Sequence, residues 1–166
     1  MRPTASRLCA KLLINPIHFL SLGFGSGLFP RAPGTAGTVA AIPVYLLMAQ
    51  LQLPVYLGLT FLMFGLGIYL CAETSRELGG SDHPAIVWDE IVGFCITMIA
   101  VPVKFEWVLA GFLLFRFFDI LKPWPIRVLD RRIKGGLGIM LDDVLAGFFA
   151  ALVLHFIVMP FMQGSL

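Results

Sequence analysis

The sequence predicts a small, all-α membrane protein with several helical segments. Of its 166 residues, 58% are hydrophobic and only 13% are charged, whereas about 25% of the residues of a typical soluble domain are charged. The apolar residues form long runs that lack the period-two alternation of a membrane β-strand. Inside a bilayer such runs must be helical, because a helix satisfies its own backbone hydrogen bonds. A chain of this length predicts one domain, residues 1–166.

About five apolar segments follow one another along the chain, at residues 38–53, 55–72, 91–103, 107–121 and 144–162. The first two segments and the next two are separated by short proline-containing stretches, which predicts two helical hairpins. The third and fourth segments, at 13 and 15 residues, reach only about 20 Å against a hydrocarbon core of about 30 Å. They either extend into the polar motifs beside them or do not cross fully.

Basic residues are distributed unevenly between the two predicted membrane faces. If all five segments cross, Lys104 lies on one face and the other eleven Lys and Arg residues lie on or beside the opposite face. These eleven are Arg2, Arg7, Lys11, Arg31, Arg76, Arg116, Lys122, Arg127, Arg131, Arg132 and Lys134. Short loops rich in Lys and Arg stay in the cytoplasm. We therefore expect the N-terminus and the polar motifs to face the cytoplasm and the C-terminus to lie outside.

Two adjacent acidic pairs, Asp89-Glu90 and Asp142-Asp143, each precede an apolar run. One interpretation is helix capping, since a carboxylate stabilises a helix N-terminus. A cap needs only one carboxylate, however, and an ionised carboxylate at the bilayer centre costs about 2.5–3.5 kcal/mol. Mg²⁺ takes oxygen ligands, usually one or two carboxylates together with water and substrate phosphate. Two mutually repulsive pairs on one membrane face favour a shared Mg²⁺ site.

The end of the fourth segment carries charges at helical spacing. Arg116, Asp119 and Lys122 stand at positions i, i+3 and i+6, so consecutive members are neighbours on a helix. An ion pair that admits Arg116 to the membrane border is one explanation. The other makes Asp119 a further metal ligand and Lys122 a phosphate contact.

Five glycines precede Thr38 and the first long segment. A glycine-rich backbone at a helix start can bring its amides close to a phosphate group. The same small residues can instead allow tight helix packing, and composition alone does not separate these two interpretations. The first makes substrate-binding candidates of Gly25, Ser26, Gly34 and Thr35.

Four motifs occur in a fixed order along the chain. They are Gly23-Phe24-Gly25-Ser26-Gly27 with Pro33-Gly34-Thr35, Val87-Trp88-Asp89-Glu90, Phe118-Asp119 with Lys122-Pro123-Trp124-Pro125, and Gly135-Gly136 through Gly138-Ile139-Met140-Leu141-Asp142-Asp143-Val144-Leu145-Ala146-Gly147. Together they closely resemble bacterial phosphatidylglycerophosphatase A. The likeness covers roughly residues 20–160, and the four motifs show no departure from the family pattern.

The resemblance implies an all-helical fold. With the apolar segments and the distribution of basic residues, we expect a multi-pass protein of the bacterial inner membrane whose active site faces the cytoplasm. The resemblance also implies Mg²⁺-dependent removal of the terminal phosphate from phosphatidylglycerophosphate, which gives phosphatidylglycerol. The expected partners are this lipid and the membrane, with no nucleic acid, and the oligomeric state is left open. We expect direct attack by water, with an aspartate nucleophile as the alternative.

The residue pattern and the resemblance together give two sets of site residues. The predicted metal ligands, which we also expect to act in catalysis, are Asp89, Glu90, Asp119, Asp142 and Asp143. The predicted phosphate contacts are Gly25, Ser26, Gly34, Thr35 and Lys122.

A different class of protein fits part of the same pattern. A small membrane transporter or channel component would bind an anion with the glycine-rich segment and relay cations with the carboxylates. That hypothesis predicts acidic residues near the middle of the membrane, whereas here they gather at one border, so we favour the enzyme. A purely structural membrane subunit leaves the paired acids unexplained.

Overall fold

The computed structural model describes residues 12–79 and 83–164, which form helices and no strand. In chain order these are α2 (Pro16–Ser21), the 3-10 helix η1 (Gly23–Leu28), α3 (Pro33–Met48), α4 (Leu53–Glu77), α5 (Trp88–Thr97), α6 (Phe105–Leu121), α7 (Ile126–Arg132), α8 (Gly135–Val153), the π-helical turn η2 (Leu154–Val158) and α9 (Met159–Gly164). The all-α prediction is confirmed. Arg2, Arg7 and Lys11, on which the topology prediction partly depends, lie outside the described residues.

Local sequence signals explain where several helices begin and end. Pro16 occupies the first turn of α2, where its missing N–H costs nothing, and the Asn15 side chain accepts a hydrogen bond of 2.9 Å from the amide of Ile17. Pro33 opens α3 in the same way. α6 ends at Lys122, whose φ of 43° is left-handed and cannot continue a right-handed helix. That reversal turns the chain back towards α7 and α8.

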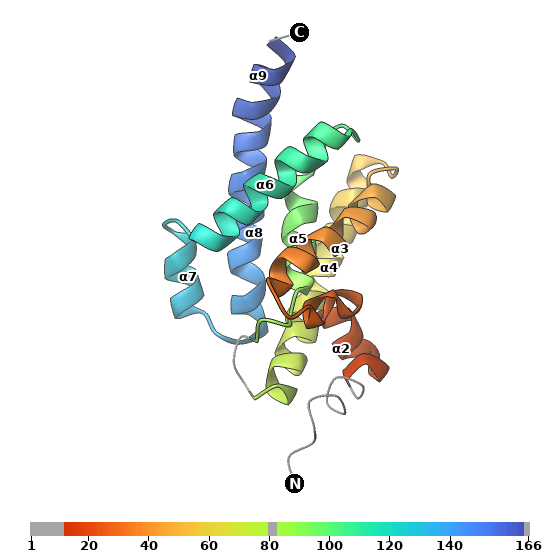
Figure 1. Ribbon diagram of the computed structural model, residues 1–166, viewed down its shortest axis with the longest axis vertical. Coiled ribbons are helices and arrows are strands. Elements are labelled where there is room, and N and C mark those ends of the chain that lie inside the picture. The colour runs from red at the N-terminus through yellow and green to blue at the C-terminus, as the bar shows by residue number, and fades with distance from the viewer. Residues whose placement is uncertain (1–11, 80–82, 165–166) are drawn as a thin grey trace.

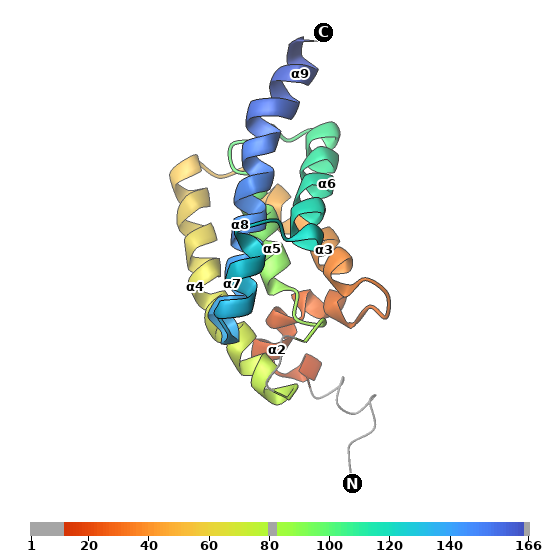
Figure 2. The same cartoon turned by 90° about the vertical axis from the view of Figure 1, so that its left-hand side faces the viewer.

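Helix α5 is the central helix of the bundle (Figures 1 and 2) and packs against α3, α4, α6 and α8. Its Phe94 is fully buried and meets Tyr45 of α3 and Phe115 of α6 edge to face, with ring centroids 6.0 and 6.5 Å apart. A helix that is apolar almost all round is typical of a position surrounded by other helices. The polar residues of α5 are confined to its ends, at the first turn and at Thr97.

Glycines allow α5 and α8 to cross closely. A Cβ atom at Gly93 would lie 2.7 Å from the carbonyl oxygen of Asp143, and one at Gly147 would collide with the carbonyl oxygen of Gly93. The Thr97 hydroxyl, at the same crossing, donates to the carbonyl oxygens of Gly93 at 3.0 Å and Gly147 at 3.4 Å. Small residues at a crossing let two helix backbones approach. This approach sets the polar first turn of α5 beside α8.

The structure corrects several predicted segment boundaries. α8 begins at Gly135 rather than at residue 144, so Asp142 and Asp143 lie inside the helix and not at its start. α5 has only 10 residues and spans about 15 Å, which is about half of a hydrocarbon core of about 30 Å. The two helices of the first predicted hairpin, α3 and α4, do not pack along each other. Instead, α4 packs mainly against α2, α5 and α8.

Two helices in the described part of the chain have the length and hydropathy of a membrane crossing, at Leu53–Glu77 and Gly135–Phe161. α3 is apolar but shorter. Length and hydropathy thus support two of the five predicted crossings. Figures 1 and 2 show α2, the end of α4, and the starts of α5 and α8 towards one end of the molecule, with the C-terminus of α9 at the other. The topology prediction requires this arrangement.

Candidate functional site

Three carboxylates from two helices form a compact cluster. Asp89 and Glu90 lie in the first turn of α5, one turn before Gly93, and Asp143 lies one turn before Gly147 in α8. Residues one turn apart share a helix face, so the glycine crossing turns all three side chains towards each other. One carboxylate oxygen of each lies within 4.8 Å of the other two. Asp89 and Glu90 are 9% exposed, and Asp143 is 2% exposed.

Neither acidic pair is a helix cap. Val87 occupies the capping position of α5, with Asp89 and Glu90 following inside the first turn. Asp142 and Asp143 lie in the third turn of α8. The capping interpretation of the two pairs is therefore wrong, and the burial of these carboxylates needs another explanation.

The cluster presents oxygens that fit a divalent cation. Within the described parts of the chain, Asp89 Oδ1, Glu90 Oε2 and Asp143 Oδ2 are buried and have no hydrogen-bond partner. Leaving a charged oxygen buried and unpaired costs several kcal/mol, and native structures leave few such atoms. Hard divalent cations such as Mg²⁺ bind carboxylate oxygens. The donor set of Asp89, Glu90 and Asp143 therefore suits an ion of that kind.

The protein environment makes the two carboxyls of α5 weak acids when no cation is bound. Burial raises the pKa of Asp89 well above its usual range, and the charges of Glu90 and Asp143 raise it further. Burial also raises the pKa of Glu90, to about 7, although the neighbouring Asp89 carboxyl and the charge of Arg116 oppose the change. Repulsion and desolvation of this kind are removed when a cation replaces the protons.

Arg116 and Asp119 of α6 border the cluster. They form an ion pair, as their i, i+3 spacing allows, and the Arg116 guanidinium also lies 3.9 Å from Oε1 of Glu90. Their side chains are only 15% and 14% exposed. Asp119 is close enough for its charge to raise the pKa of Glu90. Arg116 is thus a cation of the site that the predicted set of site residues omits, although its spacing from Asp119 was visible in the sequence.

Lys122 and Asp142 form an ion pair between the end of α6 and α8. The Lys122 ammonium also donates a hydrogen bond of 3.2 Å to Oδ1 of Asp130 in α7. Burial lowers the pKa of Lys122, but the hydrogen bonds and charges of Asp142 and Asp130 outweigh it, so the pKa lies above its ordinary value. Lys122 is therefore a cation throughout the physiological pH range, and Asp130 is a second partner that the sequence prediction missed.

These groups share one cavity of about 250 Å³. Its charged wall contains Asp89, Glu90, Arg116, Asp119, Lys122, Asp142 and Asp143. Gly34, at the start of α3, also lines it, and a Cβ atom there would collide with Oε1 of Glu90 and lie 3.0 Å from Nη1 of Arg116. The structure thus brings all five predicted metal ligands to one cavity, together with two cations.

Known proteins match this chain over most of its length. The sequence model of the family described as Phosphatidylglycerophosphatase A matches residues 19–158. The chain belongs to the phosphatidylglycerophosphatase A family. A relative of that name from Escherichia coli is 49% identical over 144 residues, which are 86% of this chain and 84% of the relative. The Haemophilus influenzae relative of that name is 51% identical over 143 residues, which are 85% of this chain and 88% of the relative.

Membership of the phosphatidylglycerophosphatase A family confirms the resemblance that the four motifs predict, and the matched residues contain all four motifs. A Bacteroides thetaiotaomicron relative, provisionally named a phosphatidylinositol-3-phosphatase, is 38% identical over 142 residues, which are 81% of this chain and 89% of the relative. No solved structure matches the chain.

The predicted phosphate contacts of this family member do not all meet at the acidic cavity. Gly34 and Lys122 line it, whereas Thr35 lines a separate cavity on α3. Gly25 and Ser26 lie in η1 and are not part of the acidic cavity's wall. The sequence pattern therefore locates two of the five candidates at the cavity.

Packing explains part of the glycine-rich stretch of the family motif. A Cβ atom at Gly27 would collide with the carbonyl oxygen of Ala85, and one at Gly37 would lie 2.5 Å from Cβ of Val87. Both contacts hold η1 and α3 against the stretch that leads into α5. Gly27 and Gly37 therefore fit the interpretation of tight helix packing. Gly34, which contacts Glu90, fits the interpretation of a backbone close to the phosphate.

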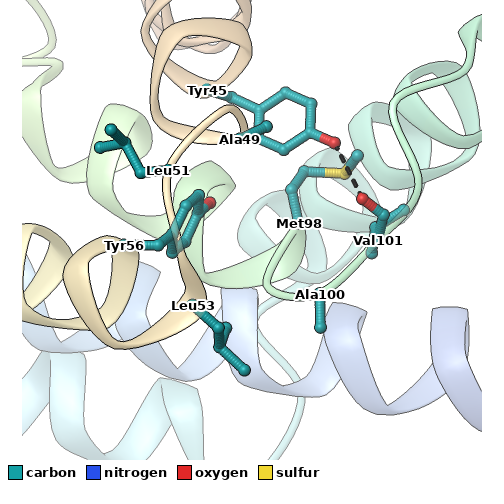
Figure 3. A pocket seen from close by; sticks show the side chains of 8 residues that line it. All are labelled: Tyr45, Ala49, Leu51, Leu53, Tyr56, Met98, Ala100 and Val101. Atoms are coloured by element: carbon teal, nitrogen blue, oxygen red, sulfur yellow. Dashed lines mark hydrogen bonds between the residues drawn. The ribbon is translucent and has the colours of Figure 1, made fainter.

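A smaller cavity lies at the other end of the bundle, between the α3–α4 and α5–α6 connections (Figure 3). The Tyr45 hydroxyl donates to the carbonyl oxygen of Val101 at 3.3 Å, and the Tyr56 hydroxyl donates to that of Cys95 at 2.6 Å. The other side chains shown there are apolar. Both hydroxyls are used within the fold, so we assign these tyrosines to packing and to anchoring the connections.

Proposed function

We propose that this protein is a lipid phosphatase that hydrolyses the terminal phosphomonoester of phosphatidylglycerophosphate and gives phosphatidylglycerol. The two relatives named phosphatidylglycerophosphatase A support this assignment. The Bacteroides relative's name refers to a different headgroup, but both names describe removal of a phosphate from a lipid. The relatives carry phosphatase names, so the comparisons give the transporter alternative no support.

The observation that carries the proposal is the buried carboxylate cluster beside two cations in one cavity. We assign Asp89, Glu90 and Asp143 as the residues that hold Mg²⁺, with Asp119 beside them. When bound, Mg²⁺ supplies charge neutralisation for the phosphate and activates water for in-line attack. The three unpaired buried oxygens of the cluster fit this ion.

The cations and the start of α3 are placed to bind the phosphate itself. Arg116 and Lys122 both line the cavity and offer charge-assisted hydrogen bonds to phosphoryl oxygens. The N-terminus of α3, at Gly34, adds the positive end of a helix. A fixed set of donors stabilises the negative charge that develops in the transition state without reorganisation. We propose that Asp142 positions Lys122 through their ion pair, which differs from the metal-ligand role predicted from the sequence.

We also propose that the enzyme is embedded in the bacterial inner membrane with its acidic cavity facing the cytoplasm. Two helices long and apolar enough to cross a membrane support this. So do large exposed apolar side chains such as Phe61, Phe105 and Phe156, each more than 75% exposed, because a bilayer would remove such side chains from water. Short basic loops favour the cytoplasmic side.

Labelling with a membrane-impermeant maleimide tests that orientation. Lys134→Cys and Lys104→Cys, made in a chain without its native cysteines, each provide a single exposed thiol. Lys134 precedes α8 and Lys104 precedes α6, and the starts of these two helices lie towards opposite ends of the molecule (Figure 1). We expect Lys104→Cys to react in sealed spheroplasts and Lys134→Cys to react only after permeabilisation. Labelling of Lys134→Cys in sealed spheroplasts contradicts the orientation.

Phosphate release by the purified protein tests the activity. In detergent micelles with phosphatidylglycerophosphate and Mg²⁺, we expect inorganic phosphate and phosphatidylglycerol in equal amounts, and we expect a chelator to stop the reaction. Glu90→Gln should abolish turnover, whereas Glu73→Gln, the same change in a surface ion pair with Arg76, should not. A folded wild-type protein that releases no phosphate at any Mg²⁺ concentration contradicts the proposal.

A further inference from the structure

A second cavity adjoins the acidic one on the same helix. It has a volume of about 440 Å³ and is lined by Phe29, Arg31, Ala32, Thr35, Ala36 and Val39. We call it the α3 groove. Ala32 lines both the α3 groove and the acidic cavity, so the two spaces meet at the first turn of α3.

The geometry of that turn separates a polar side from an apolar side. Ala32 adopts a left-handed conformation with φ of 52° and ends the stretch that carries Phe29 and Arg31. Gly34 then faces Glu90 and Arg116 in the acidic cavity. Further along α3, Val39 lies four residues after Thr35 and three after Ala36, so it neighbours both of them on the surface of the helix. One turn of α3 is therefore the common wall of the two spaces.

The α3 groove is chemically different from the acidic cavity. Phe29 is 59% exposed and Val39 is 52% exposed, so two large apolar side chains are left unburied within it. Arg31, the residue before Ala32 in the chain, adds a positive charge to the lining. An apolar trough that carries one cation, and that shares Ala32 with the acidic cavity, matches the order of groups in a phospholipid: a charged phosphodiester followed by an acyl chain.

We propose that the α3 groove binds the diacylglycerol end of the lipid substrate, with Arg31 contacting its phosphodiester and with Phe29 and Val39 contacting an acyl chain. This inference rests on the proposed function, because it takes the acidic cavity on the other side of Ala32 as the place of the reacting phosphate. The headgroup glycerol spans the Ala32 wall between the two phosphates. Arg31 forms a charge-assisted hydrogen bond to the anionic diester, and the apolar contacts remove acyl surface from water.

The groove residues act on substrate affinity and not on the chemical step. An interaction made equally in the ground state and the transition state lowers KM without raising kcat. Loss of one charge-assisted hydrogen bond raises KM about tenfold, which corresponds to about 1.4 kcal/mol. A residue with a merely structural role would instead change kcat and the stability of the fold.

Two variants and two substrates separate the contributions of charge and of acyl contact. Arg31→Gln removes the cation, and Val39→Trp fills the trough without adding charge. The matched controls are Arg131→Gln, at an exposed arginine of α7, and Val55→Trp, at a valine of α4 that is 49% exposed. The substrates are phosphatidylglycerophosphate in micelles and its deacylated, water-soluble counterpart, which keeps both phosphates.

For Arg31→Gln we expect a KM about tenfold higher for both substrates, with kcat within about twofold of wild type. For Val39→Trp we expect a higher KM for the intact lipid only. The control variants should match wild type on both substrates. If the wild type is active and both groove variants match their controls on both substrates, the groove inference is wrong and the proposed function stands. If the folded wild type releases no phosphate from the lipid, both fail together.

Discussion

Lys122 at the end of α6 forms an ion pair with Asp142 of α8, while the next residue, Asp143, joins Asp89 and Glu90 in the carboxylate cluster. Adjacent residues on a helix point about 100° apart, so one acidic pair serves two different partners. The charge of Lys122 is thereby held beside the cluster without occupying it. This division gives the two neighbouring aspartates different expected phenotypes.

We predict that Asp143→Asn and Asp142→Asn separate metal binding from phosphate binding. Asp143→Asn removes a ligand of the cluster, so Mg²⁺ should no longer raise the melting temperature, whereas at 100 times its Kd it stabilises the wild type by about 2.7 kcal/mol. Asp142→Asn should keep the Mg²⁺-induced shift and raise KM. Thermal unfolding with and without Mg²⁺ measures the first effect. Loss of the Mg²⁺ shift in Asp142→Asn, with retention in Asp143→Asn, would reverse the assignment.

The Lys122–Asp142 pair should show strong energetic coupling. Lys122→Met leaves the Asp142 carboxylate, whose side chain is only 6% exposed, without its ammonium partner, and a lost hydrogen bond to a buried charge costs about 1.5–3 kcal/mol. Adding Asp142→Asn to Lys122→Met should recover part of that stability because the unpaired charge of Asp142 is then removed. A double-mutant cycle from denaturant unfolding measures the coupling. Additive effects would show that the pair is not formed.

Gly34 should be intolerant of any side chain. Gly34→Ala places a Cβ atom against Oε1 of Glu90 and Nη1 of Arg116, and a displacement of about 1 Å at a catalytic group can lower turnover about 100-fold. Gly65→Ala is the matched control, since a Cβ atom there meets nothing within 4 Å. We expect kcat to fall for the first variant and to stay unchanged for the second. Equal turnover of both variants would show that Gly34 is not part of the active site.

The sequence predicts which residues form this site better than it predicts the role of each residue. The acidic pairs, Asp119 and Lys122 stand out because charged residues are scarce in the chain and each borders an apolar run. Arg116 was visible as an i, i+3 partner of Asp119, but spacing alone does not show that its guanidinium also approaches Glu90. That contact depends on how α6 packs beside α5.

The start of α8 shows why the boundaries were harder to predict. The glycines at 135, 136 and 138 resemble a loop in the sequence, yet they lie in the first turns of the helix. Gly136 is helical because its missing side chain lets α8 approach α4, where a Cβ atom would collide with the carbonyl oxygen of Ile68. Such a tertiary contact overrides the low helix propensity of glycine. Without it, Asp142 and Asp143 appear to precede the helix and to be caps.

The apparent affinity for Mg²⁺ should rise with pH. Burial raises the pKa of Glu90 to about 7 from an ordinary 4.5, and metal binding requires the ionised carboxylate, so binding releases protons. In the metal-free protein, the free energy of unfolding changes with pH in the opposite direction and falls as the pH rises. The contribution of Glu90 to stability is fully present below about pH 4.5 and is lost as the pH rises through about 7.

Thermal unfolding at a pH of about 6 and about 8 checks this linkage. The Mg²⁺-induced rise in melting temperature should be larger at the higher pH, while the metal-free protein should be less stable there. Without metal, Glu90→Gln should lose less stability than the wild type between the two pH values, because its own titration is removed. A Mg²⁺ shift that is equal at both pH values would contradict the pKa assignment.

The central claim is that Asp89, Glu90 and Asp143 together hold the divalent ion. Anomalous diffraction from crystals grown with Mn²⁺, an ion that can replace Mg²⁺ at oxygen sites, tests it directly. The account predicts an anomalous peak in the acidic cavity within about 2.0–2.3 Å of an oxygen from each of the three residues, and no such peak in Asp143→Asn. A peak on other residues, or an empty cluster in a protein that turns over at full rate with Mn²⁺, would contradict it.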